Sequence, residues 1–240
     1  MNVGFFYFRQ LFYAKIKCNM HIYPKAFIFD LNGTMINDME YHAKVWYHIL
    51  TDELHANLTY EQVRKQMYGK NEEVLVRVFG ADHFTNQEMQ EISIRKEKDY
   101  QRLFLPELKL INGLTQFLEK ATLKNIPMGI ASAAIPFNID FVLDNLHIRH
   151  FFKTIVSADD VVMSKPDPEV FTLASNRIEV EPKACLVFED SPKGVEAALH
   201  AGMNAIAITT MHEPIEFEGY SNVLGFINDY SDKLLNQLFE

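Results

Sequence analysis

The stretch FIFDLNGTMIND, residues 27–38, decides the fold of this chain. An apolar run with the composition of a buried strand ends on Asp30, and the turn-forming residues Asn32, Gly33 and Thr34 follow almost at once. A carboxylate at the end of a buried strand costs free energy unless a counter-ion or a metal lies beside it. We therefore expect Asp30 to mark a functional site at the carboxyl end of the first strand.

The composition narrows the classes of protein to consider. With 240 residues, 48% of them hydrophobic, the chain can form one large core, or a core domain with a smaller partner. Its net charge of -9 argues against a polyanionic partner such as nucleic acid. Cys18 and Cys185 are too far apart in sequence to suggest a zinc site or a disulfide framework, which fits the cytoplasm. No apolar run approaches the roughly 18 residues that a membrane helix needs, so we expect no membrane span.

The N-terminal segment MNVGFFYFRQLFYAKIKCNM differs from the rest in being aromatic and basic. Arg9 splits its apolar run, and no small-residue cleavage site follows, so it does not fit a signal peptide. We predict that residues 1–19 are an extension that is either loose or packed on the surface, and that the domain itself begins near Met20.

Helical patterns fill residues 37–105. Capping boxes begin at Thr59 and Thr85, and an apolar-periodic stretch between them stops at Gly80. From Pro106 onward strands alternate with helices, which predicts a parallel sheet with helices on both faces. The predicted strands are 25–30, 127–132, 154–157, 184–189 and 205–209, and the helices that follow residue 106 are 113–124, 137–146, 168–176 and 192–201.

The fold class expected from this pattern is α/β: a doubly wound, Rossmann-like parallel sheet core with an inserted all-helical cap domain. The core domain is predicted to comprise residues 20–36 and 106–240, and the cap residues 37–105. Hinges are expected near 36–39 and 105–110.

Polar side chains recur where the predicted strands end. They are Asp30, Ser132, the pair Glu189 and Asp190, and Lys165 in the loop after the third strand. In a parallel sheet these ends share one crevice. Clustered buried carboxylates need more positive charge than one lysine supplies, and Mg²⁺ with a substrate phosphate would provide it. Asp30 could then attack phosphorus as a nucleophile.

In order and spacing, DLNGT at 30–34, Ser132, Lys165 in KPDP and VFEDSPKGVEAA at 187–198 resemble the four motifs of the haloacid dehalogenase superfamily of phosphotransferases. The likeness covers roughly residues 22–215. The helical insertion is similar to the cap of the β-phosphoglucomutase and phosphoglycolate-phosphatase branch. The resemblance implies Asp30 as nucleophile and metal ligand, Asn32 as ligand through its backbone carbonyl, and Asp190 as a further ligand. It implies Glu189 as a ligand or a water-mediated neighbour of the metal, and Ser132 and Lys165 as phosphate-binding catalytic residues.

The same resemblance implies a set of substrate contacts. They are Leu31, His42, Gly69, Lys70, Asn71, Lys96 and Ala133, together with Ser132 and Lys165. For His42, a role at the cap hinge and a plain position on a helix surface both stay open. The mutases have basic residues where this chain has Tyr68 and Glu72, and this difference favours a phosphatase. Lys96 matches a cap lysine of the mutases, so a mutase stays open as the alternative.

Asn32 departs from the family pattern, which has an aspartate acid–base residue at this place. A carboxamide cannot transfer a proton near neutral pH. Three explanations stay open: His42 or a substrate group carries the proton, the leaving group needs no acid, or the asparagine is an engineered substitution.

We expect a Mg²⁺-dependent phosphatase that acts on a small phosphorylated metabolite, in the first place a sugar phosphate, through a phospho-Asp30 intermediate. One alternative is a hexose-phosphate mutase of the β-phosphoglucomutase type. Another is a catalytically weak phosphate-binding protein that lost turnover through Asn32. A small molecule is the only partner expected, without nucleic acid or membrane, and a monomer is favoured.

Overall fold

The computed structural model describes residues 23–239, so the predicted extension over residues 1–19 lies outside the described residues. Its centre is a six-stranded sheet in the order β3-β2-β1-β4-β5-β6, with every neighbouring pair parallel. The strands are β1 (Ala26–Phe29), β2 (Met128–Ala131), β3 (Thr154–Val156), β4 (Cys185–Glu189), β5 (Asn204–Ile208) and β6 (Val223–Ile227).

Strand β1 lies in the middle of the sheet, and all four of its residues are buried. Alternate side chains of a strand point to opposite faces. Phe29 stacks on Phe188 at 4.9 Å on one face, in the same apolar cluster as Phe117. Ile28 belongs to the cluster of the other face, together with Phe171. Both faces are therefore covered, as a doubly wound sheet requires.

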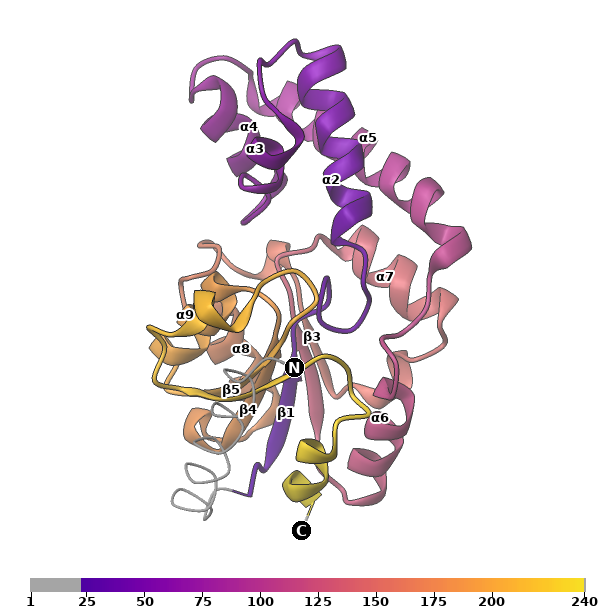
Figure 1. Cartoon of the computed structure of the whole chain (residues 1–240), viewed down its shortest axis with the longest axis vertical. Coiled ribbons are helices and arrows are strands. Elements are labelled where there is room, and N and C mark those ends of the chain that lie inside the picture. Colours follow the sequence, from indigo (N-terminus) through magenta and orange to yellow (C-terminus); the bar gives the residue numbers. More distant parts are fainter. Residues whose placement is uncertain (1–22, 240) are drawn as a thin grey trace, which may run out of the picture.

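In the described part of the chain, helices cover both of these faces (Figure 1). Residues of α6 and α7 join the cluster of Phe29, and residues of α8 and α9 join that of Ile28. The helices are α6 (Leu114–Leu123), α7 (Pro136–Asn145), α8 (Glu169–Ile178) and α9 (Pro192–His200). Short 3₁₀ turns lie at Leu105–Glu107, Arg149–Phe151, Ala158–Asp160, Pro182–Ala184, Pro214–Phe217 and Lys233–Phe239.

A helical unit follows β1, lies above the carboxyl ends of the strands and is called the cap below (Figure 1). It consists of α2 (Met39–Tyr47), a π-helical turn (His48–Glu53), α3 (Tyr60–Arg64), α4 (Asn71–Phe79) and α5 (Asn86–Phe104). The capping boxes at Thr59 and Thr85 are confirmed, and α4 ends before Gly80 as predicted. The predicted fold class is confirmed, whereas the exact domain limits stay predictions.

Two details differ from the sequence prediction. Strand β6 was not predicted, and it pairs with β5 at the sheet edge, for example Ile227 with Ile208. The first helix of the predicted helical segment 37–105, α2, changes to π-helical geometry at His48 instead of continuing as an α-helix. The two predicted hinge segments lie side by side, since Ile36 and Leu110 form an antiparallel bridge.

Within residues 23–239 no helix has the length and apolar character needed to span a membrane.

Candidate active site

Asp30 is presented by a tight turn that follows β1. Its amide still belongs to the sheet and donates to the Phe188 carbonyl at 3.0 Å, and the Met35 amide closes the turn by donating to the Leu31 carbonyl at 2.8 Å. Gly33 has φ +74°, and a Cβ there would lie 2.0 Å from Asp190 Oδ2. Only glycine lets the turn approach Asp190 so closely.

Lys165 is the counter-ion that the buried carboxylates require. Its Nζ donates to Asp30 Oδ1 at 2.6 Å and to Glu189 Oε1 at 2.7 Å. All three side chains are at most 9% exposed. The two carboxylates and a cation–π contact with the Phe171 ring hold the ammonium in place. Burial alone would lower the pKa of Lys165, but the two carboxylates raise it above its usual value.

Glu189 and Asp190 end β4 and are fixed by the start of α9. Ser191 donates its amide (2.7 Å) and its hydroxyl (3.0 Å) to Glu189 Oε2. The same hydroxyl accepts from the Gly194 amide at 3.0 Å, which caps the helix. Asp190 Oδ1 accepts from the Thr34 hydroxyl at 3.2 Å. The start of α9 thus holds the Glu189 carboxylate and the turn after β1 holds that of Asp190, both close to Asp30.

Asp30, Glu189 and Asp190 form a cluster with the donor set of a hard cation. One carboxylate oxygen from each lies within 4.8 Å of the others. Three buried carboxylates face a single ammonium, so the cluster has excess negative charge. Burial, followed by the neighbouring carboxylates, raises the pKa of Asp190 well above its usual range, and burial raises the pKa of Asp30 to about 7 despite Lys165. A divalent cation would neutralise this excess negative charge. The three carboxylates therefore fit a divalent cation such as Mg²⁺.

Ser132 reaches the same place from β2. Its amide donates to the Val156 carbonyl of β3 at 3.0 Å, and its hydroxyl accepts from the Ala134 amide at 3.1 Å. The side chain is 1% exposed and lines the cavity described below. The strand-end residues predicted from the sequence are therefore brought together at one edge of the sheet.

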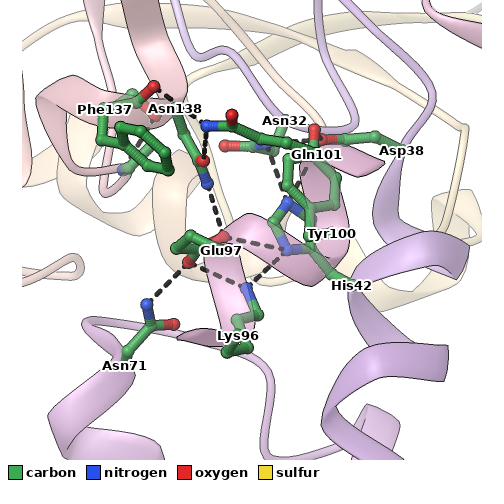
Figure 2. A network of polar contacts seen from close by, with 12 residues as sticks. Asn32, Asp38, His42, Asn71, Lys96, Glu97, Tyr100, Gln101, Phe137 and Asn138 are labelled. Carbon is green, nitrogen blue, oxygen red and sulfur yellow. Dashed lines mark hydrogen bonds and ion pairs between the residues drawn. The ribbon is translucent and has the colours of Figure 1, made fainter. Parts of the chain in front are cut away.

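The Asn32 side chain belongs to a polar network that reaches the cap (Figure 2). Its Nδ2 donates to Asp38 Oδ2 at 2.6 Å and lies 3.2 Å from His42 Nε2. Asp38 also accepts from the Gly33 amide at 3.1 Å and from the Tyr100 hydroxyl at 2.5 Å. Burial would raise the pKa of Asp38, but the hydrogen bonds from His42, Tyr100 and Asn32 hold it below its usual value.

His42 is not a plain surface histidine, since it is buried at the hinge end of α2. Its ring stacks on Tyr100 with the centroids 3.7 Å apart. Lys96 Nζ lies 2.6 Å from its Nδ1, and an ammonium can only donate. Nδ1 therefore accepts, and Nε2 carries the ring proton toward Asp38 Oδ2 at 3.3 Å.

A cavity of about 560 Å³ lies between the core and the cap. It is lined by all the predicted site residues except Leu31 and Lys70, namely Asp30, Asn32, His42, Gly69, Asn71, Lys96, Ser132, Ala133, Lys165, Glu189 and Asp190. The two exceptions have other positions. The Leu31 side chain is fully buried in the core, and Lys70 Nζ donates to the Val161 carbonyl at 2.9 Å, which joins the cap to the core.

Several lining residues were not predicted. Arg64 and Lys65 come from α3, Glu97 from α5 and Asn138 from α7, while Met39, Trp46, Met67, Val74, Met211 and His212 supply apolar or aromatic surface. The sequence carried little signal for most of them, because none belongs to the four motifs around Asp30, Ser132, Lys165 and Asp190. Glu97 was the exception, since it directly follows the predicted Lys96. Tyr68 lines the cavity, with the Arg77 guanidinium 3.7 Å from its ring centre, whereas Glu72 does not line it.

The doubly wound parallel sheet, the inserted helical cap and the clustered carboxylates define an α/β protein of the Rossmann-like class with a cavity between its core and its cap. The family profile described as haloacid dehalogenase-like hydrolase matches residues 27–208. The β-phosphoglucomutase of Bacillus subtilis is 33% identical over 190 residues, which are 77% of this chain and 83% of the relative. The chain therefore belongs to the haloacid dehalogenase-like hydrolases.

Other relatives agree with this membership. The fructose-1-phosphate phosphatase of Escherichia coli is 29% identical over 187 residues, 75% of this chain and 94% of the relative. A solved haloacid dehalogenase hydrolase of family IA from Entamoeba histolytica has a TM-score of 0.80 at 23% identity, over 89% of this chain and 97% of that one. The latter similarity concerns the fold alone. The predicted family and its β-phosphoglucomutase-like branch are thus confirmed.

Proposed function

We propose that this protein is a Mg²⁺-dependent phosphatase that hydrolyses a small phosphorylated metabolite, a sugar phosphate, through a phosphoryl group carried on Asp30. The observation that supports it most directly is the set of contacts at the end of β1. Asp30 lies at the edge of the cavity, Lys165 holds one of its oxygens at 2.6 Å, and Glu189 and Asp190 lie beside it. Together these groups can hold, attack and release a phosphoryl group.

In the first step a carboxylate oxygen of Asp30 attacks phosphorus. The ester P–O bond breaks, and its electron pair leaves with the alcohol oxygen, which must take up a proton. Lys165 keeps Asp30 in place, and Lys165 and the Ser132 hydroxyl can bind the phosphoryl oxygens. A Mg²⁺ ion held by Asp30, Glu189, Asp190 and the Asn32 carbonyl would neutralise charge on the phosphoryl group.

In the second step water attacks the phosphoryl group, releases inorganic phosphate and restores Asp30. Both steps gain from a group that transfers a proton, and Asn32 cannot do so. Its amide is bound to Asp38 instead, at 2.6 Å. We therefore expect slow turnover unless His42, which lines the same cavity, or the substrate carries the proton.

The cap is proposed to recognise the leaving group, since it supplies the wall of the cavity opposite Asp30. Its lining combines hydrogen-bonding side chains such as Asn71 with apolar ones such as Met67. Relatives named as phosphatases of fructose 1-phosphate and of phosphorylated carbohydrates support a sugar phosphate. We further propose that the enzyme acts in the cytoplasm and binds no nucleic acid, consistent with its net charge of -9.

A substrate panel tests the proposal. It contains fructose 1-phosphate, glucose 1-phosphate, glycerol 3-phosphate, pyrophosphate and p-nitrophenyl phosphate, each with Mg²⁺ or with a chelator, and released phosphate is measured. We expect hydrolysis of at least one sugar phosphate that stops when the metal is chelated. Wild-type protein that binds Mg²⁺ and phosphate yet hydrolyses none of these compounds would favour the alternative of a phosphate-binding protein.

The 33% identity to a β-phosphoglucomutase favours a hexose-phosphate mutase as second candidate. Lys96, the residue that kept this alternative, has its Nζ bound by Glu97 and near His42. A mutase would convert glucose 1-phosphate to glucose 6-phosphate only when a hexose bisphosphate is added. Conversion that depends on the bisphosphate, with negligible phosphate release, would decide for the mutase.

Mg²⁺ binding is predicted to weaken as the pH falls through about 7. Burial raises the pKa of metal-free Asp30 to about 7, so below this pH the carboxyl keeps a proton that must leave before a cation binds. Competition by one proton lowers the apparent affinity up to about tenfold per pH unit. Isothermal titration with Mg²⁺ at about pH 8, 7 and 6 measures this, and an affinity that does not change with pH would contradict the prediction.

A further inference from the structure

Glu97 is a buried carboxylate that joins the cap to the core (Figure 2). It lies on α5 and is 4% exposed. Oε1 accepts from Asn71 Nδ2 at 2.6 Å and from Lys96 Nζ at 2.9 Å, both in the cap. Oε2 accepts from Asn138 Nδ2 at 2.6 Å, which belongs to α7 of the core. One oxygen therefore serves each side of the cavity.

The core side of this contact leads to the loop of Ser132, whose hydroxyl is proposed to bind the phosphoryl group. Asn138 lies in the first turn of α7, which starts just after the loop of Ser132. Gln101, one turn after Glu97 on the same face of α5, donates to Asn138 Oδ1 at 2.9 Å and to the Phe137 carbonyl at 3.1 Å. Because Gln101 occupies Oδ1, the amide NH₂ of Asn138 has to face Glu97.

The cap side leads to the residues around Asn32. Lys96 is 2% exposed, and a buried ammonium needs a compensating charge, which Glu97 supplies. The same Nζ contacts His42 Nδ1 at 2.6 Å, and His42 lies beside Asn32. Burial would raise the pKa of Glu97, but the charge of Lys96 and the hydrogen bonds from Asn71 and Lys96 lower it to about 2. Glu97 is therefore ionised and accepts only.

We propose that Glu97 is a positioning residue that fixes the cap over the reaction centre, by holding Lys96 and Asn71 with one oxygen and Asn138 with the other. The proposal rests on the proposed phosphatase function, because it concerns the distance between the two walls that a substrate spans. A substrate whose leaving group reaches the cap depends on this distance. A minimal phosphoryl donor, acetyl phosphate, whose leaving group is too small to fill the cavity, does not.

Glu97→Gln tests the proposal with little change of shape. The new amide keeps only one acceptor oxygen. Its NH₂ group must face either the Asn138 donor on the core side or the Asn71 and Lys96 donors on the cap side, so the hydrogen bonds of one side are lost. We expect kcat/KM for the best sugar phosphate of the panel to fall about 10–100-fold, as a misplacement near 1 Å does. For acetyl phosphate the expected change is below about threefold.

A compensating variant separates positioning from loss of structure. In Glu97→Gln with Asn138→Asp, the introduced amide donates to the introduced carboxylate, whose second oxygen still accepts from Gln101. We expect kcat/KM for the sugar phosphate to recover to within about fivefold of wild type. Glu91→Gln, the same substitution at an exposed site of α5, is the matched control and should change neither substrate.

A second readout is independent of activity. Trp46, the single tryptophan of the sequence, lines the cavity, and Lys96 Nζ lies 5.5 Å from its ring centre. The emission maximum of Trp46 should shift in Glu97→Gln, return to the wild-type value in the double variant and stay unchanged in Glu91→Gln.

Each outcome decides the proposal. An equal loss of kcat/KM for both donors, or no recovery in the double variant, overturns it. If wild-type protein hydrolyses neither donor, the proposed phosphatase function fails, and the Trp46 fluorescence alone tests whether Glu97 positions the cap. An emission shift in Glu97→Gln that the double variant reverses supports this positioning role. An unchanged emission in Glu97→Gln overturns it.

Discussion

Replacing Asn32 with aspartate is expected to raise the hydrolysis rate of a sugar phosphate by about 10²–10⁴-fold, the usual contribution of general acid–base catalysis. The physical reason is the 2.6 Å contact between Asn32 Nδ2 and Asp38 Oδ2. Two carboxyl groups at this distance cannot both ionise. Asp38 is held ionised by Tyr100, Gly33 and His42, so the proton resides on the introduced carboxyl. This is the protonation state that a leaving alcohol requires.

Steady-state kinetics at neutral pH with Mg²⁺ measure the effect. A comparison with p-nitrophenyl phosphate makes the test more specific. The p-nitrophenolate leaving group needs little protonation, so Asn32→Asp should raise the rate of P–O bond cleavage less for this substrate than for a sugar phosphate. Asn37→Asp, the same substitution at an exposed neighbour outside the cavity, is the matched control. An unchanged or lowered rate in Asn32→Asp would show that another group, such as His42, already carries the proton, or that the site has another task.

Asp30→Asn is expected to lower the rate by a factor on the order of 10⁴ or more and to abolish covalent phosphorylation of the protein. A carboxamide has no nucleophilic oxygen of comparable strength, yet it has the same size and can still accept from Lys165. The fold should persist, because the substitution removes one of three buried negative charges. The unfolding midpoint without metal should therefore be equal to or above that of wild type.

Intact-protein mass spectrometry after a rapid acid quench detects the phosphoryl group, with p-nitrophenyl phosphate as donor. Wild-type protein should show the phosphorylated species, and Asp30→Asn should not. Asp82→Asn, at an exposed turn position, controls for the substitution itself and should behave as wild type. A phosphorylated Asp30→Asn protein would place the nucleophile on a different side chain.

The structure brings the polar residues at the strand ends together in one cavity, whereas their roles stay predictions. Asp30, Ser132, Lys165 and the pair Glu189 and Asp190 are far apart in sequence, yet parallel topology places successive strand ends at one edge of a sheet. Recognising the alternation of strands and helices was therefore enough to bring them together. Strand β6 escaped prediction because it lies at the edge of the sheet beyond the last motif, is only partly buried and lacks a continuous apolar run.

The cap residues were harder to place. Lys70 follows Gly69 directly, and both were expected to face substrate, but only Gly69 lines the cavity. The Lys70 ammonium binds the Val161 carbonyl of the core instead. A side chain of this length can reach either partner, and the choice depends on where the core loop lies in space.

The sequence alone determined the class of the fold, the family and the residues around Asp30. It could do so because periodicity, capping boxes and strand-end polarity are local patterns with a fixed spatial meaning. Only the tertiary structure decided that the Asn32 amide is bound to Asp38, and that Glu97 joins Asn71 to Asn138. Such contacts arise where a separately folded helical layer meets the sheet, and the relative position of two layers depends on the packing of their whole surfaces, which no short stretch of sequence encodes.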